Sequence, residues 1–119
     1  MQRRQILTSN KMAEETVRPW GNYTVVGKTK IIEINPKQKL SYQSHNLRDE
    51  FWLILNGDGN IIIDGLEKKA YMGDDFYIAK GKKHRAIAGN NGLTFLEIST
   101  GIVDEDDIIR YEDDYGRIK

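Results

Sequence analysis

The chain has 119 residues, 39% of them hydrophobic and 30% charged, which fits one compact domain. Its 18 basic and 18 acidic side chains cancel at pH 7, which argues against a nucleic acid or an anionic membrane as partner. It has no cysteine, so disulfides and thiolate ligands are excluded and any metal must be held by nitrogen and oxygen atoms. No apolar run approaches the roughly 20 residues of a bilayer span.

The first stretch, "MQRRQILTSNKMAEE", is polar and has no sustained hydrophobic period. It also lacks the apolar core of a signal peptide, so we expect a cytoplasmic protein. Residues 1–15 are predicted to form a tail or a short helix, and residues 16–119 a single domain.

From Trp20 onward, β-branched and aromatic residues alternate with polar ones and are interrupted every few positions by Gly, Asn, Asp or Pro. This rhythm predicts an all-β domain of about eight short strands. The expected strands cover residues 22–28, 29–36, 39–45, 50–57, 59–65, 67–73, 75–81, 84–89 and 93–100. We expect a tight hairpin at Asn56–Gly59 and a turn at Gly89–Gly92, because Gly, Asn and Asp tolerate positive φ.

The last segment, "VDEDDIIRYEDDYGR", is acidic and differs from the rest of the chain. A short helical turn capped by Asp104 is expected at its start, because a carboxylate there accepts hydrogen bonds from free backbone N–H groups. A jelly roll is the favoured closure of the whole strand series, since it limits exposed strand edges.

The stretch "SYQSHNLRDEFW" gathers several polar side chains in residues 41–52. Strand alternation places Gln43 and His45 on one face, and the bend "NLRD" is long enough to bring Glu50 back over it. His84, the only other histidine, opens a later strand. From spacing alone these residues are either a metal site or the solvated polar ends of strands.

A second pattern surrounds the first. The segment Gln43-x-His45-x4-Glu50-x6-Gly57 resembles the first signature of the cupin superfamily, with glutamine in place of the usual first histidine. Gly73-x5-Ala79-x-Gly81-x2-His84 resembles the second signature, with alanine in place of proline.

More narrowly, "RPWGNY", "LSYQSHNLRDEFWLILNG", "YIAKGKKHR" and "DEDDIIRYEDDYGR" are similar to the type II mannose-6-phosphate isomerase domain. In many bacteria that domain is fused to a mannose-1-phosphate guanylyltransferase, and nothing in this chain resembles the nucleotide loop of that enzyme. The family usually shows a run of histidines where this chain has His45-Asn46-Leu47, and "PAG" where it has Ala79-Lys80-Gly81.

The resemblance implies a cupin double-stranded β-helix that holds one divalent metal ion on Gln43, His45, Glu50 and His84. Zinc suits such a mixture of nitrogen and oxygen ligands, while manganese, cobalt and iron stay open. It further implies the interconversion of mannose 6-phosphate and fructose 6-phosphate through an enediol. The expected ligand is a small sugar phosphate, and the expected oligomeric state is a homodimer.

Arginines are the expected ligands of the phosphate and of the developing charge, because guanidinium groups fork onto oxyanions. Arg48 matches an arginine of the family's histidine run, and Arg85 and Arg117 are the further candidates. Arg85 directly follows His84, so it is either a substrate ligand or a surface arginine that strand alternation turns to the other face. Lysines 80, 82 and 83 share the turn before His84, and Lys83 is included as a substrate ligand.

Glu97 is the candidate base, because it is an acid flanked on both sides by apolar strand residues. Asp113, Asp114 and a lysine are its rivals for that role. The aromatic residues Trp20, Trp52 and Tyr77 belong either to a sugar pocket or simply to the core.

Two other functions fit the same barrel. A non-catalytic, sugar-binding regulatory cupin is favoured by the missing histidines and the missing second domain. An iron-dependent dioxygenase is disfavoured by the small number of histidines.

Overall fold

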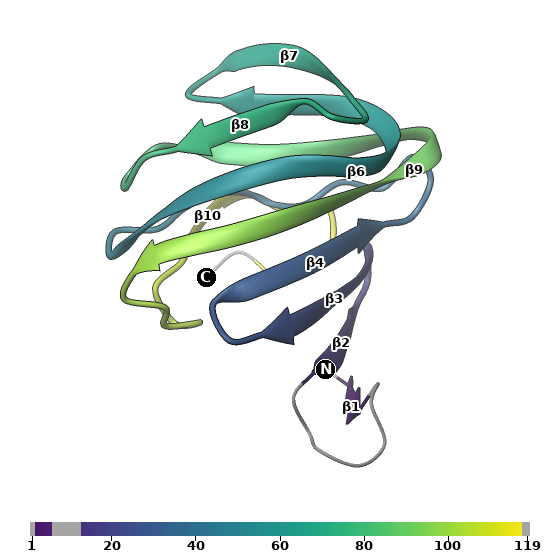
Figure 1. Cartoon of the computed structure of the whole chain (residues 1–119). Coiled ribbons are helices and arrows are strands. Elements are labelled where there is room, and N and C mark those ends of the chain that lie inside the picture. Colours follow the sequence, from purple (N-terminus) through teal and green to yellow (C-terminus); the bar gives the residue numbers. More distant parts are fainter. Residues whose placement is uncertain (1, 6–12, 118–119) are drawn as a thin grey trace.

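The computed structural model describes residues 2–5 and 13–117, and these form an all-β structure. The strands are β1 (Gln2–Gln5), β2 (Glu14–Arg18), β3 (Gly21–Val26), β4 (Thr29–Ile34), β5 (Tyr42–Ser44), β6 (Arg48–Ile63), β7 (Leu66–Tyr71), β8 (Asp75–Ile78), β9 (His84–Gly101) and β10 (Ile109–Glu112). They belong to one curled sheet with the order β1-β2-β3-β4-β9-β5-β10, and β6 joins β7 and β8 to β9 (Figure 1). The expected all-β jelly-roll class is confirmed.

Two long antiparallel strands form the centre of the fold. The register of β6 and β9 runs from Arg48 opposite Gly101 to Ile63 opposite His84. The first half of β6 also pairs with β8 and its second half with β7. One continuous strand therefore pairs with two short strands along its length. The predicted hairpin at Asn56–Gly59 and the predicted turn at Gly89–Gly92 are therefore wrong, because each lies inside a continuous strand.

The glycines of these two stretches let the strands bend together. The register shifts between Ile54 and Asn56 and again between Gly57 and Gly59. Gly57 has φ of 79°, and a Cβ atom on it would lie 2.1 Å from the carbonyl oxygen of Gly92. Positive φ thus creates a bulged corner here and not a chain reversal.

The bend also reverses which residues face inward. On β6 the buried side chains before it are even-numbered, at Arg48, Glu50, Trp52 and Ile54, and Ile61 is buried after it. On β9 His84 is buried before the bend and Phe95 and Glu97 after it. A bulge adds one residue to a period of two, so an even position and an odd position of one strand reach the same interior.

The apolar core lies inside the curl of the sheet. Trp52 and Phe95 are fully buried and their ring centroids are 4.4 Å apart. The Trp52 ring also meets the edge of His84 at 5.5 Å, so the core directly supports the polar side chains beside it.

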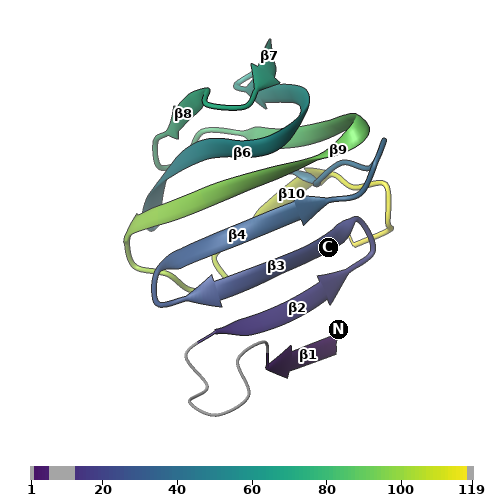
Figure 2. The same ribbon diagram turned by 45° about the vertical axis from the view of Figure 1, so that its right-hand side comes forward.

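Both ends of the chain add strands to the sheet. Gln2–Gln5 forms β1 and pairs with β2, where a tail or a short helix was expected (Figure 2). This pairing uses backbone groups, which a polar side-chain pattern does not reveal. Residues 6–12, also part of that expectation, lie outside the described residues.

At the other end, β10 pairs with β5 and brings the C-terminal segment across the inside of the curl. Asp104 accepts a hydrogen bond from the backbone N of Asp106 (2.9 Å), as its predicted capping role requires, although the segment is a turn and not a helix. The Tyr111 and Ser44 hydroxyls, 2.9 Å apart, fix β10 against β5.

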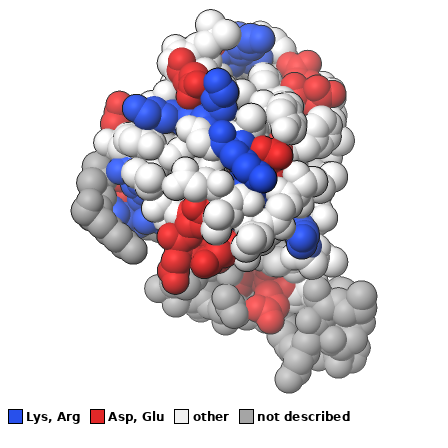
Figure 3. All heavy atoms as spheres, turned by 90° about the vertical axis from the view of Figure 1, so that its left-hand side faces the viewer, with Lys and Arg blue, Asp and Glu red and all other residues white. Residues whose placement is uncertain are grey.

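The surface carries charges of both signs. On the face shown in Figure 3, Lys and Arg side chains lie next to Asp and Glu side chains, separated by uncharged areas. Across the described residues, the structure has no helix long and apolar enough to cross a membrane.

Candidate metal centre and adjoining cavity

Three buried side chains converge inside the curl. His45 follows β5, Glu50 lies near the start of β6 and His84 opens β9, and one ligand atom from each lies within 4.8 Å of the others. The Nε2 atoms of His45 and His84 are 3.5 Å and 3.7 Å from the two carboxylate oxygens of Glu50. We call this group the metal centre, because it can hold a divalent cation.

Backbone carbonyls orient both imidazole rings. The Nδ1 atom of His45 donates to the carbonyl of Asp107 (2.7 Å), and that of His84 to the carbonyl of Lys82 (2.9 Å). Since a carbonyl only accepts hydrogen bonds, each ring carries its proton on Nδ1 and directs a bare Nε2 toward Glu50. Metal-binding histidines need such a hydrogen bond on the far ring nitrogen, because it fixes the tautomer and the orientation of the ring.

Glu50 is held from two further sides. Arg48 Nε donates to its Oε2 (2.9 Å) and Trp52 Nε1 to its Oε1 (3.0 Å). The Arg48 guanidinium also lies 3.2 Å from the Nε2 atom of His45, so it supplies the positive charge of the centre in this structure.

The titration behaviour of the group suits cation binding. Burial lowers the pKa of His45 to about 4, opposed by the Glu50 carboxylate and reinforced by Arg48. Burial likewise lowers the pKa of His84, and Glu50 partly offsets it. Burial alone would raise the pKa of Glu50, but the two histidines and Arg48 together lower it. The centre therefore offers two neutral imidazoles and one carboxylate at neutral pH.

One atom of the centre shows that a cation would fit. The Nε2 atom of His84 is buried and has no hydrogen-bond partner within the part of the chain that the structure describes. A bare nitrogen lone pair in that position costs free energy unless something coordinates it. The donor set and this orphaned atom are together consistent with a bound divalent metal.

Gln43, the fourth expected ligand, lies beside the centre. It is paired in register with His84, and its Oε1 accepts a hydrogen bond from Ser41 (3.0 Å). It lines the same cavity as His45, as strand alternation predicted. Three of the four candidate ligands thus form one group, and Gln43 lines the cavity beside it.

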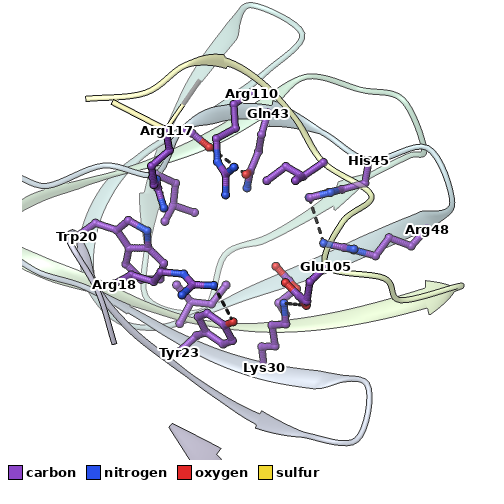
Figure 4. A pocket seen from close by; sticks show the side chains of 15 residues that line it. Arg18, Trp20, Tyr23, Lys30, Gln43, His45, Arg48, Glu105, Arg110 and Arg117 are labelled. Atoms are coloured by element: carbon purple, nitrogen blue, oxygen red, sulfur yellow. Dashed lines mark hydrogen bonds and ion pairs between the residues drawn. The ribbon is translucent and has the colours of Figure 1, made fainter. Parts of the chain in front are cut away.

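A cavity of about 120 Å³ opens next to the metal centre (Figure 4). Its lining is rich in charged side chains on both sides of an apolar floor. The lining residues are Arg18, Trp20, Tyr23, Lys30, Ile32, Leu40, Ser41, Gln43, His45, Arg48, Glu97, Glu105, Ile108, Arg110 and Arg117.

Glu97 faces this cavity from β9 and is buried. Burial and the neighbouring Glu50 carboxylate raise the pKa of Glu97 to about 8, although Lys30 and Arg48 oppose the shift. Its Oε2 has no hydrogen-bond partner among the described residues. A carboxyl group of this kind carries its proton at neutral pH and releases it under mild electrostatic change.

Several expected site residues do not reach the cavity. Arg85 is on the opposite face of β9 from His84, where it donates to the Leu40 carbonyl (3.0 Å) and to Glu112 (3.2 Å). Lys83 lies over the Tyr111 ring, with Nζ 4.3 Å from its centroid. Neither lines the cavity. Arg85 faces away because adjacent strand residues point to opposite faces, and Lys83 precedes β9.

The aromatic candidates divide in the same way. Trp20 lines the cavity, Trp52 belongs to the core and holds Glu50, and Tyr77 is 63% exposed on β8. The rivals to Glu97 are also occupied: Asp113 binds Arg117, and Asp114 pairs with Lys39 at 3.5 Å.

Sequence reasoning missed four charged cavity residues, namely Arg18, Lys30, Glu105 and Arg110. Lys30 shares the inward face of β4 with Ile32 and Ile34, an unusual place for a lysine, and its Nζ lies 2.8 Å from Glu105. That alternation was a readable signal. The inward positions of Glu105 and Arg110 could not be predicted from the sequence, since they depend on where the C-terminal segment folds.

Comparisons with known proteins agree with this architecture. Residues 6–113 match the model of the family described as mannose-6-phosphate isomerase C-terminal. The mannose-1-phosphate guanylyltransferase ManC of Salmonella typhimurium is 33% identical over 114 residues, which cover 90% of this chain and 24% of that protein. The chain thus spans about a quarter of the length of this relative.

Two solved structures resemble the fold. The capsular polysaccharide assembling protein CapF of Staphylococcus aureus aligns with a TM-score of 0.74 at 16% identity, over 83% of this chain and 32% of that one. A cupin protein of Bacteroides fragilis aligns with a TM-score of 0.57 at 28% identity, over 61% of this chain and 64% of that one. The chain belongs to the mannose-6-phosphate isomerase C-terminal family and has the cupin double-stranded β-helix fold.

Proposed function

We propose that this domain is a metal-dependent aldose-ketose isomerase that interconverts mannose 6-phosphate and fructose 6-phosphate. The observation that carries the proposal is the position of Glu97. A buried carboxyl group with a raised pKa faces the same cavity as the metal-centre residue His45, beside the cations Lys30 and Arg48. The family match supports the choice of mannose 6-phosphate as the proposed substrate.

His45, Glu50 and His84 would hold the ion, with Gln43 as a fourth ligand. Zinc is the metal we propose, since two imidazoles, a carboxylate and an amide oxygen suit it. When bound, the ion supplies Lewis acidity that polarises the substrate carbonyl.

Glu97 is the proposed proton carrier. In the aldose-to-ketose direction it takes the proton from C2 and returns it to C1, while a hydroxyl proton moves from O2 to O1. One group must both accept and release a proton in each cycle, so a pKa near the working pH serves both halves. Burial provides that pKa for Glu97.

Arg48 and Lys30 are placed to stabilise the negative charge that develops on the substrate oxygens. Both are buried and held in place, Arg48 by Glu50 and Lys30 by Glu105. Preorganised cations in a site poor in water need no rearrangement during the reaction, which makes them effective.

A binding cupin without turnover is the second candidate. The contact between Arg48 and the Nε2 atom of His45 favours it, because an arginine that satisfies the centre lessens the need for a metal. This alternative predicts sugar phosphate binding that does not depend on Glu97.

The experiment compares turnover of mannose 6-phosphate by wild-type protein and Glu97→Gln after loading with zinc, manganese or cobalt. We expect kcat to fall by about 10²- to 10⁴-fold in Glu97→Gln, with unchanged metal content, because the variant keeps the shape but cannot carry the proton. Glu33→Gln, which removes a carboxylate from the exposed side of β4, is the matched control. Wild-type protein that binds one metal ion per chain and shows no turnover with any of the three would refute the isomerase and leave the binding cupin.

A further inference from the structure

The end of the cavity away from His45 and Arg48 is built from three arginines. Arg18 comes from the end of β2, Arg110 from β10 and Arg117 from the segment that follows β10. Figure 4 shows the three side chains entering the cavity around Trp20, opposite His45 and Arg48. We call these three residues the arginine end.

The arginine end has more positive charge than its neighbours neutralise. Arg117 is bound by Asp113 through Nε and Nη2, both at 2.9 Å. Arg18 donates to the Tyr23 hydroxyl (3.3 Å), which is uncharged. The buried Nε of Arg110 has no hydrogen-bond partner among the described residues. Among the described residues, these three guanidinium groups therefore have one carboxylate contact, that of Arg117 with Asp113.

This arrangement is costly without an anion. Burial lowers the pKa of Arg110, as do the like charges of Arg117 and Arg18, with Asp113 the only opposing influence in the group. Half-buried like charges repel one another, and a bound anion would remove both the repulsion and the unpaired N–H group.

The chain fold brings these arginines together from distant positions. The stretches "RPWGNY" and "YEDDYGR" lie at opposite ends of the domain and supply Arg18 and Arg117. The C-terminal stretch is fixed by β10 pairing with β5 and by the Tyr115 hydroxyl, which donates to Gln38 (2.6 Å). Both stretches thus place an arginine in the lining of the same cavity.

We propose that Arg18, Arg110 and Arg117 form the subsite for the phosphomonoester dianion of a hexose 6-phosphate, with the C1 and C2 end of the sugar directed to the metal centre. Guanidinium groups match a phosphate because each presents parallel N–H donors. The identity of the sugar rests on the proposed function above, whereas the binding of the phosphoryl group does not. The arginine end thereby selects phosphorylated sugars over free ones.

The test measures binding and not turnover. Inorganic phosphate, mannose 6-phosphate, mannose 1-phosphate and mannose are titrated into zinc-loaded and chelator-treated protein, followed by calorimetry and by amide chemical shifts. Wild-type protein is compared with Arg110→Gln and with the double variant Arg117→Gln/Asp113→Asn, which leaves no unpaired carboxylate. Lys69→Gln, an exposed position on β7, controls for the loss of one positive charge elsewhere.

We expect inorganic phosphate and mannose 6-phosphate to bind about 10- to 100-fold more weakly to both arginine variants, with or without zinc, and equally well to Lys69→Gln. Mannose should bind far more weakly than mannose 6-phosphate, and mannose 1-phosphate should not reach the affinity of the 6-phosphate. Wild-type affinity for inorganic phosphate in Arg110→Gln, phosphate binding that disappears on chelation, or mannose binding as tight as that of its 6-phosphate would each overturn the proposal. Absence of isomerase turnover would not, because the subsite is defined by these affinities.

Discussion

The two ends of the cavity differ in how completely their charges are paired. At the metal centre, Arg48, Trp52 and two backbone carbonyls fix His45, Glu50 and His84 in a closed, buried group. At the arginine end, three half-buried cations stand close together and one side-chain nitrogen is left unpaired. Changes at the first end should therefore alter stability and metal affinity, and changes at the second should alter ligand affinity and leave stability almost untouched.

The largest effect is expected from Arg48→Met in metal-free protein. The variant leaves the buried Glu50 without its guanidinium partner at 2.9 Å. Removing one member of a buried ion pair typically costs about 3–5 kcal/mol of unfolding free energy. Urea denaturation measures the loss.

Zinc and a surface variant sharpen this prediction. Loading with zinc should shrink the deficit, because the ion would replace the missing positive charge. Lys82→Met breaks an exposed pair with Asp64 (3.2 Å) and should cost less than about 1 kcal/mol. An Arg48→Met deficit as small as that of Lys82→Met would contradict a closed, charge-matched centre.

His84→Ala removes one proposed ligand, and zinc affinity should fall by more than about 100-fold. Trp52→Phe keeps an aromatic ring but loses the hydrogen bond to Glu50, so its affinity should fall by about tenfold. Isothermal titration with zinc measures both, and thermal denaturation shows whether each variant is folded. Equal zinc affinity in the wild type, His84→Ala and Trp52→Phe would mean that the metal binds elsewhere.

Acidification should remove the stability that His45 contributes to the metal-free protein. Its pKa is about 4 when folded and about 6.5 in the unfolded chain, so the unfolded state binds more protons between these values. The contribution of His45 to the free energy of unfolding should then fall by on the order of 3 kcal/mol as the pH drops from 6.5 toward 4. His84, with its lowered pKa, adds to the same slope. Glu97, with its pKa raised to about 8, contributes with the opposite sign between pH 8 and 4.5.

Urea denaturation at several pH values between 7 and 4 measures that slope. The His45→Gln variant should lack this contribution, so its free energy of unfolding should decrease less, or increase more, than that of the wild type between pH 6.5 and 4, since glutamine does not titrate in this range. Identical slopes in the two proteins would show that His45 is not buried in its neutral form.

The smallest effect on stability belongs to the arginine end. Arg110→Gln relieves repulsion from Arg117 and Arg18, so its unfolding free energy should be unchanged or higher by less than about 1 kcal/mol. The same variant is the one expected to lose phosphate affinity. A clear loss of stability in phosphate-free buffer would assign Arg110 a structural role and remove the contrast between the two ends.

Parts of the site were readable from residue order. Gln43 and His45 share a face by strand alternation, Glu50 follows across a short bend, and the structure gathers them with His84. Glu97 between apolar neighbours indicated an inward-facing carboxyl group, and the structure buries it. These features depend on local periodicity, which a single sequence contains.

Other features were not readable. The glycines around Gly57 and Gly92 have the positive φ that a hairpin needs, but here they form bulges in two continuous strands. A hairpin turn and a β-bulge can both use a residue with positive φ. The strand with which the segment pairs determines which of the two forms. The bend then reverses the inward face, so counting alternation straight through the bend would misplace residues on its far side.

The sequence by itself determined the all-β class, the family and the likeness of its polar residues to a metal site, because these depend on composition, alternation and spacing. The tertiary structure decided that β6 and β9 are continuous and that Arg18, Arg110 and Arg117 meet. Such outcomes depend on pairing between segments far apart in the chain, whose free energy no local pattern records.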